Sequence, residues 1–132
     1  EAINISPANQ EAYLNLAKVY MNDNERYEDA EGVLRKFIKK NPDQEIIDIY
    51  RLLSYVYLKT AKWEKVLKQS KKIIQLDQKD LDAHKYAIMA SFELERYDDT
   101  RNLCNRVLDL SGSQNNTHSK YAKEMLELLS EK

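Results

Sequence analysis

The segment ERYEDA at residues 25–30 recurs in altered form as AKWEKV at residues 61–66 and as ERYDDT at residues 95–100. Each copy places an aromatic residue after a basic one, and a small or β-branched residue follows three places later. The aromatic residues of successive copies are separated by 36 and then 34 residues. Repetition at such a period is typical of stacked helical arrays, which mostly bind other proteins and rarely perform catalysis.

Amphipathic stretches flank these copies. Before the first two copies, an aromatic residue, a Leu, a small residue and a Tyr are spaced by three, one and three, at Tyr13, Leu16, Ala17 and Tyr20 and at Tyr50, Leu53, Ser54 and Tyr57. After the copies, steps of four and three separate Ala30, Leu34 and Phe37, then Val66, Ser70 and Ile73, then Thr100, Cys104 and Val107. Such steps keep side chains on one helical face. Each unit is therefore predicted to be two amphipathic helices joined by a short turn.

This pattern resembles the tetratricopeptide repeat, whose signature is Trp-x-x-Leu-Gly-x-x-Tyr, then Ala-x-x-x-Phe, then a Pro before the next unit. The resemblance covers nearly the whole chain. It implies an all-α fold in which antiparallel helix pairs stack as a right-handed superhelix, an α-solenoid. Small residues such as Ala17 and Ser54 would let paired helices approach closely. The aromatic residues of the repeated segment would fill the opposite crevice: Tyr27, Trp63 and Tyr97.

The resemblance divides the chain into units at residues 8–42, 43–78 and 79–112. Residues 1–7 match the last turn of a preceding unit, so we expect a fragment of a longer protein of this family. Residues 113–132 hold a polar break followed by an amphipathic helix from about residue 117. This helix is predicted to be either a cap on the array or the first helix of a fourth unit.

The units depart from one another in three ways. The first unit has one extra residue in its turn, and two more fall around residues 43–47. The third unit has His84 in the place of Trp, Ile88 in the place of Gly and Ser91 in the place of Tyr. A large side chain thus stands where the signature has a small one, and a small side chain stands where it has a large one. Such an exchange can keep the total volume the same. We expect a locally altered helix spacing in this unit.

Candidate catalytic and metal-binding residues are few. Cys104 with His84 or His118 offers a nucleophile and a base, but Cys104 lies at a core step, where a free Cys is commonly a small buried hydrophobe. Two His and one Cys within 35 residues lack the close spacing of zinc sites. The acidic turn at residues 22–25 lacks the central Gly and distal Glu of a calcium loop. The sequence therefore predicts no enzyme, no cofactor and no metal site.

Basic residues gather on the second helices of the first two units: Arg35, Lys36, Lys39 and Lys40, and Lys62, Lys65, Lys68, Lys71 and Lys72. A basic convex surface could bind nucleic acid or acidic lipid headgroups. However, the formal net charge is −1 and no exposed aromatic residues interleave with the basic ones. These observations favour a solvated face and predict no nucleic-acid partner. No apolar run reaches the length of a membrane span.

The resemblance implies that the first helices line a concave groove, with groove residues between the packing positions. Carried over residue by residue, these are Glu11, Leu14, Asn15, Lys18 and Asn22, then Asp48, Arg51, Leu52, Tyr55 and Lys59, then Asp82, Lys85, Tyr86, Met89 and Glu93. Apolar anchors beside charges of both signs are the chemistry of a peptide site. The alternative is that Leu52, Tyr55 and Met89 pack against neighbouring helices.

The predicted function is a non-catalytic interaction module that binds a peptide or a helix of a partner protein. Family members that hold the carboxyl-terminal peptides of heat-shock chaperones use a clamp of Lys, Asn and Arg residues. The corresponding residues here are Leu14, Lys18, Leu52, Asp82 and Tyr86. The clamp is absent and Asp82 would repel a terminal carboxylate, so these peptides are not expected as partners.

Two alternative functions remain open from the sequence. One is self-association into a homo-oligomer, through an open edge near Ile3 and Ile5 or through the apolar residues of the last helix, Tyr121, Met125, Leu126 and Leu129. The other is regulation or targeting of an enzyme that lies outside this chain. The sequence leaves the partner and the cellular compartment open.

Overall fold

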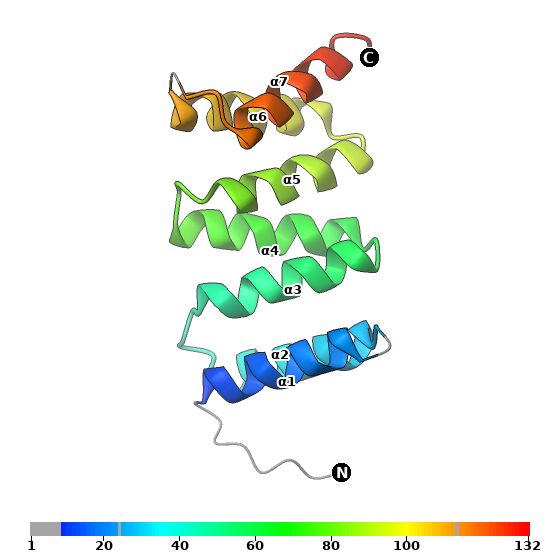
Figure 1. The fold of residues 1–132 in the computed structure, drawn as a ribbon, viewed down its shortest axis with the longest axis vertical. Helices are drawn as coiled ribbons and strands as arrows, with labels where there is room; N and C mark the ends of the chain where they lie inside the picture. The colour runs from blue at the N-terminus through cyan, green and yellow to red at the C-terminus, as the bar shows by residue number, and fades with distance from the viewer. Residues whose placement is uncertain (1–8, 24, 113) are drawn as a thin grey trace.

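The computed structural model describes residues 9–23, 25–112 and 114–132 (Figure 1). These residues form no strand, and their helices are α1 (Gln10–Asn22), α2 (Tyr27–Lys40), α3 (Ile47–Lys59), α4 (Trp63–Leu76), α5 (Leu81–Glu93), α6 (Tyr97–Ser111) and α7 (Thr117–Leu129). Within this part of the chain, no helix is both long enough and apolar enough to cross a membrane. The expected tail at residues 1–7, including Ile3 and Ile5, lies outside the described residues.

The helices stack as successive antiparallel pairs, which confirms the all-α repeat fold. α1 packs on α2, α3 on α4 and α5 on α6, and each pair contacts the next. The first helices also contact one another, α1 with α3 and α3 with α5, so they form one layer of the stack. α7 packs on α6 and contacts α5, the same relation that α5 has to α4 and α3. In Figure 1, α1 and α7 lie in front of α2 and α6.

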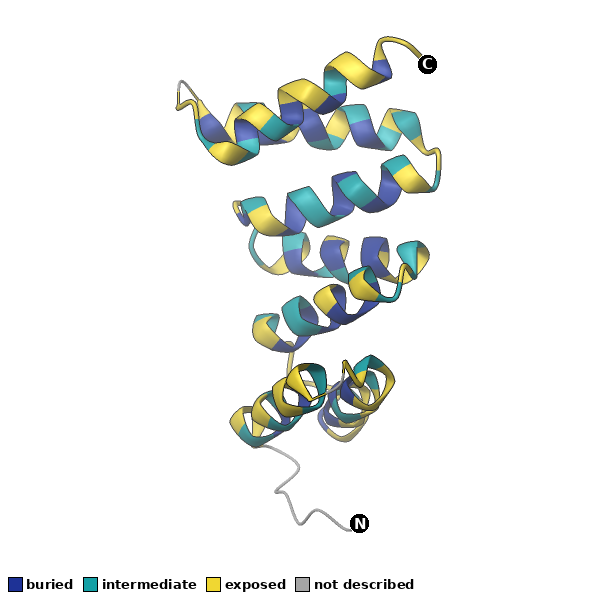
Figure 2. Ribbon diagram, turned by 45° about the vertical axis from the view of Figure 1, so that its right-hand side comes forward, coloured by how far each residue is buried: buried dark blue, intermediate teal, exposed yellow. Residues whose placement is uncertain are grey.

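The predicted core faces of the second helices point inward. Their residues at steps of four and three are at most 1% exposed: Ala30, Leu34, Phe37, Val66, Ser70, Ile73, Thr100, Cys104 and Val107. The small residues Ala17 and Ser54 are fully buried, as expected where two paired helices approach closely. Burying one Leu or Phe side chain contributes about 1.5–3 kcal/mol. These buried stripes, coloured dark blue in Figure 2, therefore hold the stack together.

The turn within each pair contains a residue of positive φ, at Glu25, Ala61 and Glu95. In the second pair, the Lys62 amide donates to the Tyr57 carbonyl over 2.9 Å, the long bond of a Schellman motif. The third pair repeats this arrangement. In the first pair, one extra residue lengthens the turn, and the Arg26 amide reaches the Tyr20 carbonyl over 3.0 Å. The repeated segment thus marks where each first helix ends.

The aromatic residue of the repeated segment begins each second helix: Tyr27, Trp63 and Tyr97. Tyr27 and Trp63 pack half-buried against the main apolar core. The ring of Tyr97 lies 5.7 Å from the ring of Phe92 at the end of the preceding helix. Each aromatic residue therefore packs the start of a second helix against neighbouring side chains, and part of its ring stays accessible.

The connections between pairs differ in length. Residues 41–46 join α2 to α3, whereas residues 77–80 join α4 to α5. Asn41 ends α2, and its side-chain amide donates to the Phe37 carbonyl over 3.0 Å. The longer first connection accompanies looser packing of α2 on α3 than of α4 on α5.

The exchange of large and small side chains in the third unit takes place inside the core. Ser54 and Tyr57 of α3, and Ile88 and Ser91 of α5, are all at most 3% exposed. The Ser91 hydroxyl lies 2.7 Å from the Thr100 hydroxyl, within hydrogen-bonding distance. The exchanged side chains therefore occupy equivalent interior positions of successive pairs.

Candidate functional site

The groove residues implied by the family resemblance all lie on α1, α3 and α5, and none is buried. The exposed ones are Glu11, Asn15, Lys18, Asn22, Asp48, Tyr55, Lys59, Asp82 and Glu93, and the half-buried ones are Leu14, Arg51, Leu52, Lys85, Tyr86 and Met89. Leu14, Leu52 and Tyr86 also pack against the main core, so part of their surface is structural. The whole set retains the accessibility that a binding groove requires.

A hollow of about 300 Å³ opens between α1 and α3 on this face. Leu14 and Lys18 line it from α1, and Asp48, Arg51 and Leu52 line it from α3. Apolar carbon therefore lies beside charges of both signs within one recess. Such a recess suits one side chain of a bound segment, with polar groups at its rim to fix orientation. Glu11, Asn15 and Asn22 are exposed on α1 outside this hollow.

Arg51 connects the hollow to the next repeat. Its guanidinium forms an ion pair with Asp80 and lies 3.9 Å from a carboxylate oxygen of Asp48. Asp80 is held in turn, because its other oxygen caps α5 by accepting the Ala83 amide over 3.0 Å. The Arg51 side chain is still 41% exposed. The groove therefore contains a fixed and accessible cation, whose position follows from the packing of α3 against α5.

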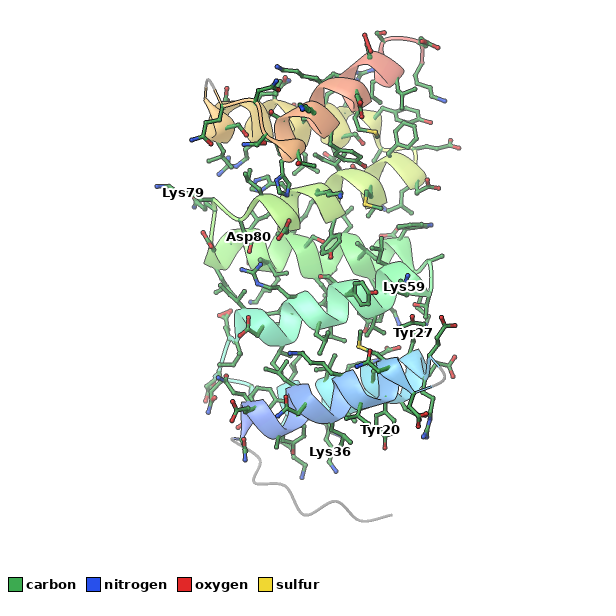
Figure 3. The ribbon with its side chains drawn as sticks, in the orientation of Figure 1. Tyr20, Tyr27, Lys36, Lys59, Lys79 and Asp80 are labelled. Carbon is green, nitrogen blue, oxygen red and sulfur yellow. The ribbon has the colours of Figure 1, made fainter. Side chains whose placement is uncertain are left out.

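Aromatic side chains lie on the same face of α3 and α5. The Lys59 ammonium lies 5.7 Å from the centre of the Tyr55 ring, close enough for a cation–π contact. Burial raises the pKa of the Tyr86 phenol, and the nearby Asp82 and Tyr55 add to this shift. Tyr86 therefore stays protonated at neutral pH and can donate a hydrogen bond. Figure 3 shows Lys59 near the end of α3, on the right of the stack, and Asp80 on the left, before α5 begins.

Two residues of α7 extend this face beyond the predicted set. The Lys85 ammonium lies 5.6 Å from the centre of the Tyr121 ring, and a His118 nitrogen lies 2.8 Å from an Asp82 oxygen. Burial raises the pKa of Tyr121 to about 12. Their position could have been found from the sequence. His118 and Tyr121 keep the spacing of the repeat, so α7 resembles the first helices of the preceding units.

The buried Cys104 matches its interpretation as a core residue. Its side chain is fully buried and burial raises the pKa of its thiol to about 11, so the thiolate is scarce at neutral pH. Within the described part of the chain, no three His, Cys, Asp or Glu side chains gather closely enough to hold a metal. Asn24 of the acidic turn lies outside that part.

Self-association through the last helix is one of the alternatives that the sequence leaves open, and the structure buries two of the four residues named for it. Met125 and Leu129 are 6% and 2% exposed. Tyr121 and Leu126 pack partly buried against the core formed by α5, α6 and α7. Met125 and Leu129 are therefore not available to a second copy, because the helix packs its apolar face against the rest of the chain. Leu128 is the large apolar side chain of α7 that remains exposed, at 49%.

Comparison with solved structures identifies the architecture. MamA superimposes with a TM-score of 0.69 at 21% identity over 80% of this chain, which spans 60% of the MamA chain. The first TPR of Spaghetti (RPAP3), bound to the HSP90 peptide SRMEEVD, gives a TM-score of 0.74 at 17% identity over 98% of this chain and 97% of that chain. The chain has the tetratricopeptide-repeat fold. No family model and no curated protein matches the sequence.

A second tetratricopeptide-like neighbour contains a bound partner segment. PcrH from Pseudomonas aeruginosa, in complex with the chaperone binding region of PopD, superimposes with a TM-score of 0.77 at 14% identity. The match covers 98% of this chain and 97% of the PcrH chain. At these identities the comparisons establish the fold, and function rests on the chain's own residues.

Proposed function

We propose that this tetratricopeptide-repeat chain is a non-catalytic interaction module that binds a peptide or a helix of a partner protein in its concave groove. The observation that carries the proposal is the row of accessible side chains on α1, α3 and α5. Tyr55 and Met89 supply apolar contact area, and the hollow beside Arg51 supplies a recess with fixed charge. The partner segments bound to PcrH and to the first TPR of Spaghetti support the use of this fold for peptide binding.

The charges of the groove favour a partner segment of mixed charge. Arg51 would attract a carboxylate, whereas Asp48 and the exposed Asp82 would attract a basic side chain. An apolar side chain between them would enter the hollow lined by Leu14 and Leu52. We do not expect the carboxyl-terminal peptides of heat-shock chaperones to bind, because the clamp positions hold Leu, Asp and Tyr in place of Asn and basic residues.

The test removes apolar contact area from the groove. Tyr55→Ala combined with Met89→Ala should reduce capture of a partner from native cell extract at least tenfold, since a few apolar anchors carry most of the binding energy. Leu76→Ala combined with Leu110→Ala is the matched control, because these exposed side chains lie on the second-helix layer. Captured proteins are quantified by mass spectrometry and helicity is checked by circular dichroism.

Each outcome has a distinct meaning. Loss of the same partner in the groove variant alone would support the proposal. Equal loss or equal retention in both variants would contradict it. A fall in helicity in the groove variant would show that Tyr55 and Met89 are core residues. Light scattering on the purified chain reports self-association separately, because a dimer that captures nothing would favour oligomerisation as the function.

A further inference from the structure

A long cleft separates α2 from α4 in the second-helix layer, away from the concave groove. Two adjoining hollows of about 550 and 460 Å³ form this cleft, and Ile38, Lys68 and Gln69 line both of them. The backbones of α2 and α4 stay apart.

Every charged side chain that lines the cleft is basic: Arg35, Lys36, Lys39, Lys68, Lys71 and Lys72. Arg35 is paired with Glu31 over 3.4 Å, and Lys72 with Glu45 over 2.6 Å. The other four form no ion pair with any residue that the structure describes. An acidic ligand could therefore pair with these four lysines without displacing a carboxylate of the chain itself.

The floor of the cleft is apolar. Leu53 and Tyr57 of α3 lie beneath one hollow and Tyr50 beneath the other, with the half-buried Ile38 between them. Cations around an apolar floor suit a segment that carries both carboxylates and apolar side chains. Leu53, Tyr57 and Tyr50 are at most 9% exposed, so the half-buried Ile38 and the aliphatic stems of the lysines supply the accessible apolar surface. Such a segment gains affinity when its apolar groups cover this surface, and orientation from its charges.

Nucleic acid fits this cleft less well than an acidic peptide. Single-stranded nucleic acid gains affinity when its bases stack on exposed aromatic rings. The two tyrosines of the cleft are buried, and lysines cover them: Lys72 lies 6.0 Å from the Tyr50 ring centre and Lys65 lies 5.4 Å from that of Tyr57. A membrane surface would meet the exposed lysine tips, but its headgroups would leave the half-buried Ile38 uncovered.

We propose that the cleft between α2 and α4 is a second docking site, which binds an acidic, leucine-containing segment of a partner protein. The site is independent of the concave groove, because none of the predicted groove residues lines it. The chain would then hold two segments on opposite layers of the stack.

The test uses a fluorescein-labelled synthetic peptide of alternating Glu and Leu residues and measures anisotropy at low salt. Lys39→Glu combined with Lys68→Glu should weaken binding at least tenfold. Lys79→Glu combined with Lys123→Glu changes the formal charge by the same amount at exposed positions outside the cleft, and should weaken binding less than threefold. A peptide with Ser in place of Leu should bind at least fivefold more weakly than the parent peptide.

Several results would overturn the proposal. Equal weakening by the two charge variants would show a response to net charge alone, and indifference to Leu would show simple counterion attraction. Tighter binding of a single-stranded oligonucleotide or of phosphatidylserine vesicles, lost in the cleft variant, would assign the cleft to another ligand class. The groove variant Tyr55→Ala with Met89→Ala should keep peptide binding. Loss of binding in that variant would place the peptide in the concave groove.

Discussion

The second and third helix pairs fill equivalent buried positions with side chains of opposite size. The second pair has Ser54 followed by Tyr57, and the third has Ile88 followed by Ser91. Tyr57 is long enough to reach the preceding pair, where its hydroxyl donates to Glu31 over 3.0 Å. Ser91 is too short for this and hydrogen-bonds within its own pair. The same interior volume thus supports a link between pairs in one case and a link within a pair in the other.

The second and third pairs also differ in the residues that link each of them to the preceding pair. Glu31 has a side chain that is 12% exposed and also lies 3.5 Å from the Lys62 ammonium. The third pair is joined to the second by the exposed pair of Arg96 and Glu64, whose side chains are 44% and 66% exposed, and by the pair of Arg51 and Asp80, in which the Asp80 side chain is 4% exposed. Exposed ion pairs contribute only about 0–1 kcal/mol. Both junctions therefore contain one largely buried carboxylate, and they differ in how closely the helices pack, because α5 packs more closely on α4 than α3 does on α2.

The largest expected effect comes from giving the second pair the side chains of the third. Tyr57→Ser should cost about 3–5 kcal/mol because it leaves a cavity, and Ser54→Ile should cost about 1–3 kcal/mol through overpacking. The double variant should cost at least about 1 kcal/mol less than the sum, because the added and the removed volume are neighbours. Chemical denaturation of the four proteins measures this coupling.

Additive costs in that cycle would contradict the view that the two positions share one volume. The reciprocal variant, Ile88→Ser with Ser91→Tyr, serves as the control. In this variant the tyrosine at position 91 has no carboxylate to bond. Glu31 lies four residues after Tyr27, and the equivalent position on α4, four residues after Trp63, is Leu67. The two substitutions should therefore offset each other in volume in the third pair as they do in the second. The reciprocal variant should not, however, gain a hydrogen bond like that between Tyr57 and Glu31.

A smaller effect is expected from removing the hydroxyl that joins the first two pairs. Tyr57→Phe should cost about 1–2 kcal/mol at pH 7, because the hydrogen bond goes to a charged group. Burial alone would raise the pKa of Glu31, but the hydrogen bond from Tyr57 and the charges of Lys62 and Lys65 outweigh it and lower the pKa. The carboxylate therefore stabilises the fold fully above its unfolded pKa of about 4.5, and this stabilisation is lost as pH falls through the lower folded pKa.

The difference in unfolding free energy between the wild type and Tyr57→Phe should therefore shrink below about pH 4.5. Tyr50→Phe is the matched control, because the structure describes no hydrogen bond from the Tyr50 hydroxyl to any described residue. Urea denaturation across pH 3–7 measures both variants. A difference for Tyr57→Phe that stayed constant with pH would exclude Glu31 as the source of the effect.

The sequence predicted the elements that depend on periodicity and missed those that depend on the rotation of helices. Steps of four and three predicted the buried stripe from Ala30 to Val107, because such spacing fixes one helical face. They could not show that α7 would bury Met125 and Leu129, since an apolar face looks the same whether it packs internally or against another chain. The cleft between α2 and α4 also escaped prediction, because periodicity does not give the spacing between helices of successive pairs.

The predicted groove depends partly on sequence spacing and partly on how the helices pack. The resemblance placed Arg51 and Tyr55 on the first-helix layer, and the structure finds them accessible there. Sequence spacing did not predict the ion pair between Asp80 and Arg51. The two residues belong to successive helix pairs and come together only when α3 and α5 pack. Whether the groove binds a partner stays a prediction.

The smallest expected effect separates the two serines of the comparison. The Ser54 hydroxyl is buried without a hydrogen-bond partner among the described residues, whereas the Ser91 hydroxyl pairs with Thr100. Ser54→Ala should raise stability by up to about 1 kcal/mol, because it removes a desolvated polar group. Ser91→Ala should lower stability by about 1 kcal/mol, because it breaks a buried hydrogen bond. Thermal unfolding should give shifts of opposite sign. Shifts of the same sign would mean that the two serines occupy equivalent environments, and that the second and third pairs differ in side-chain size alone.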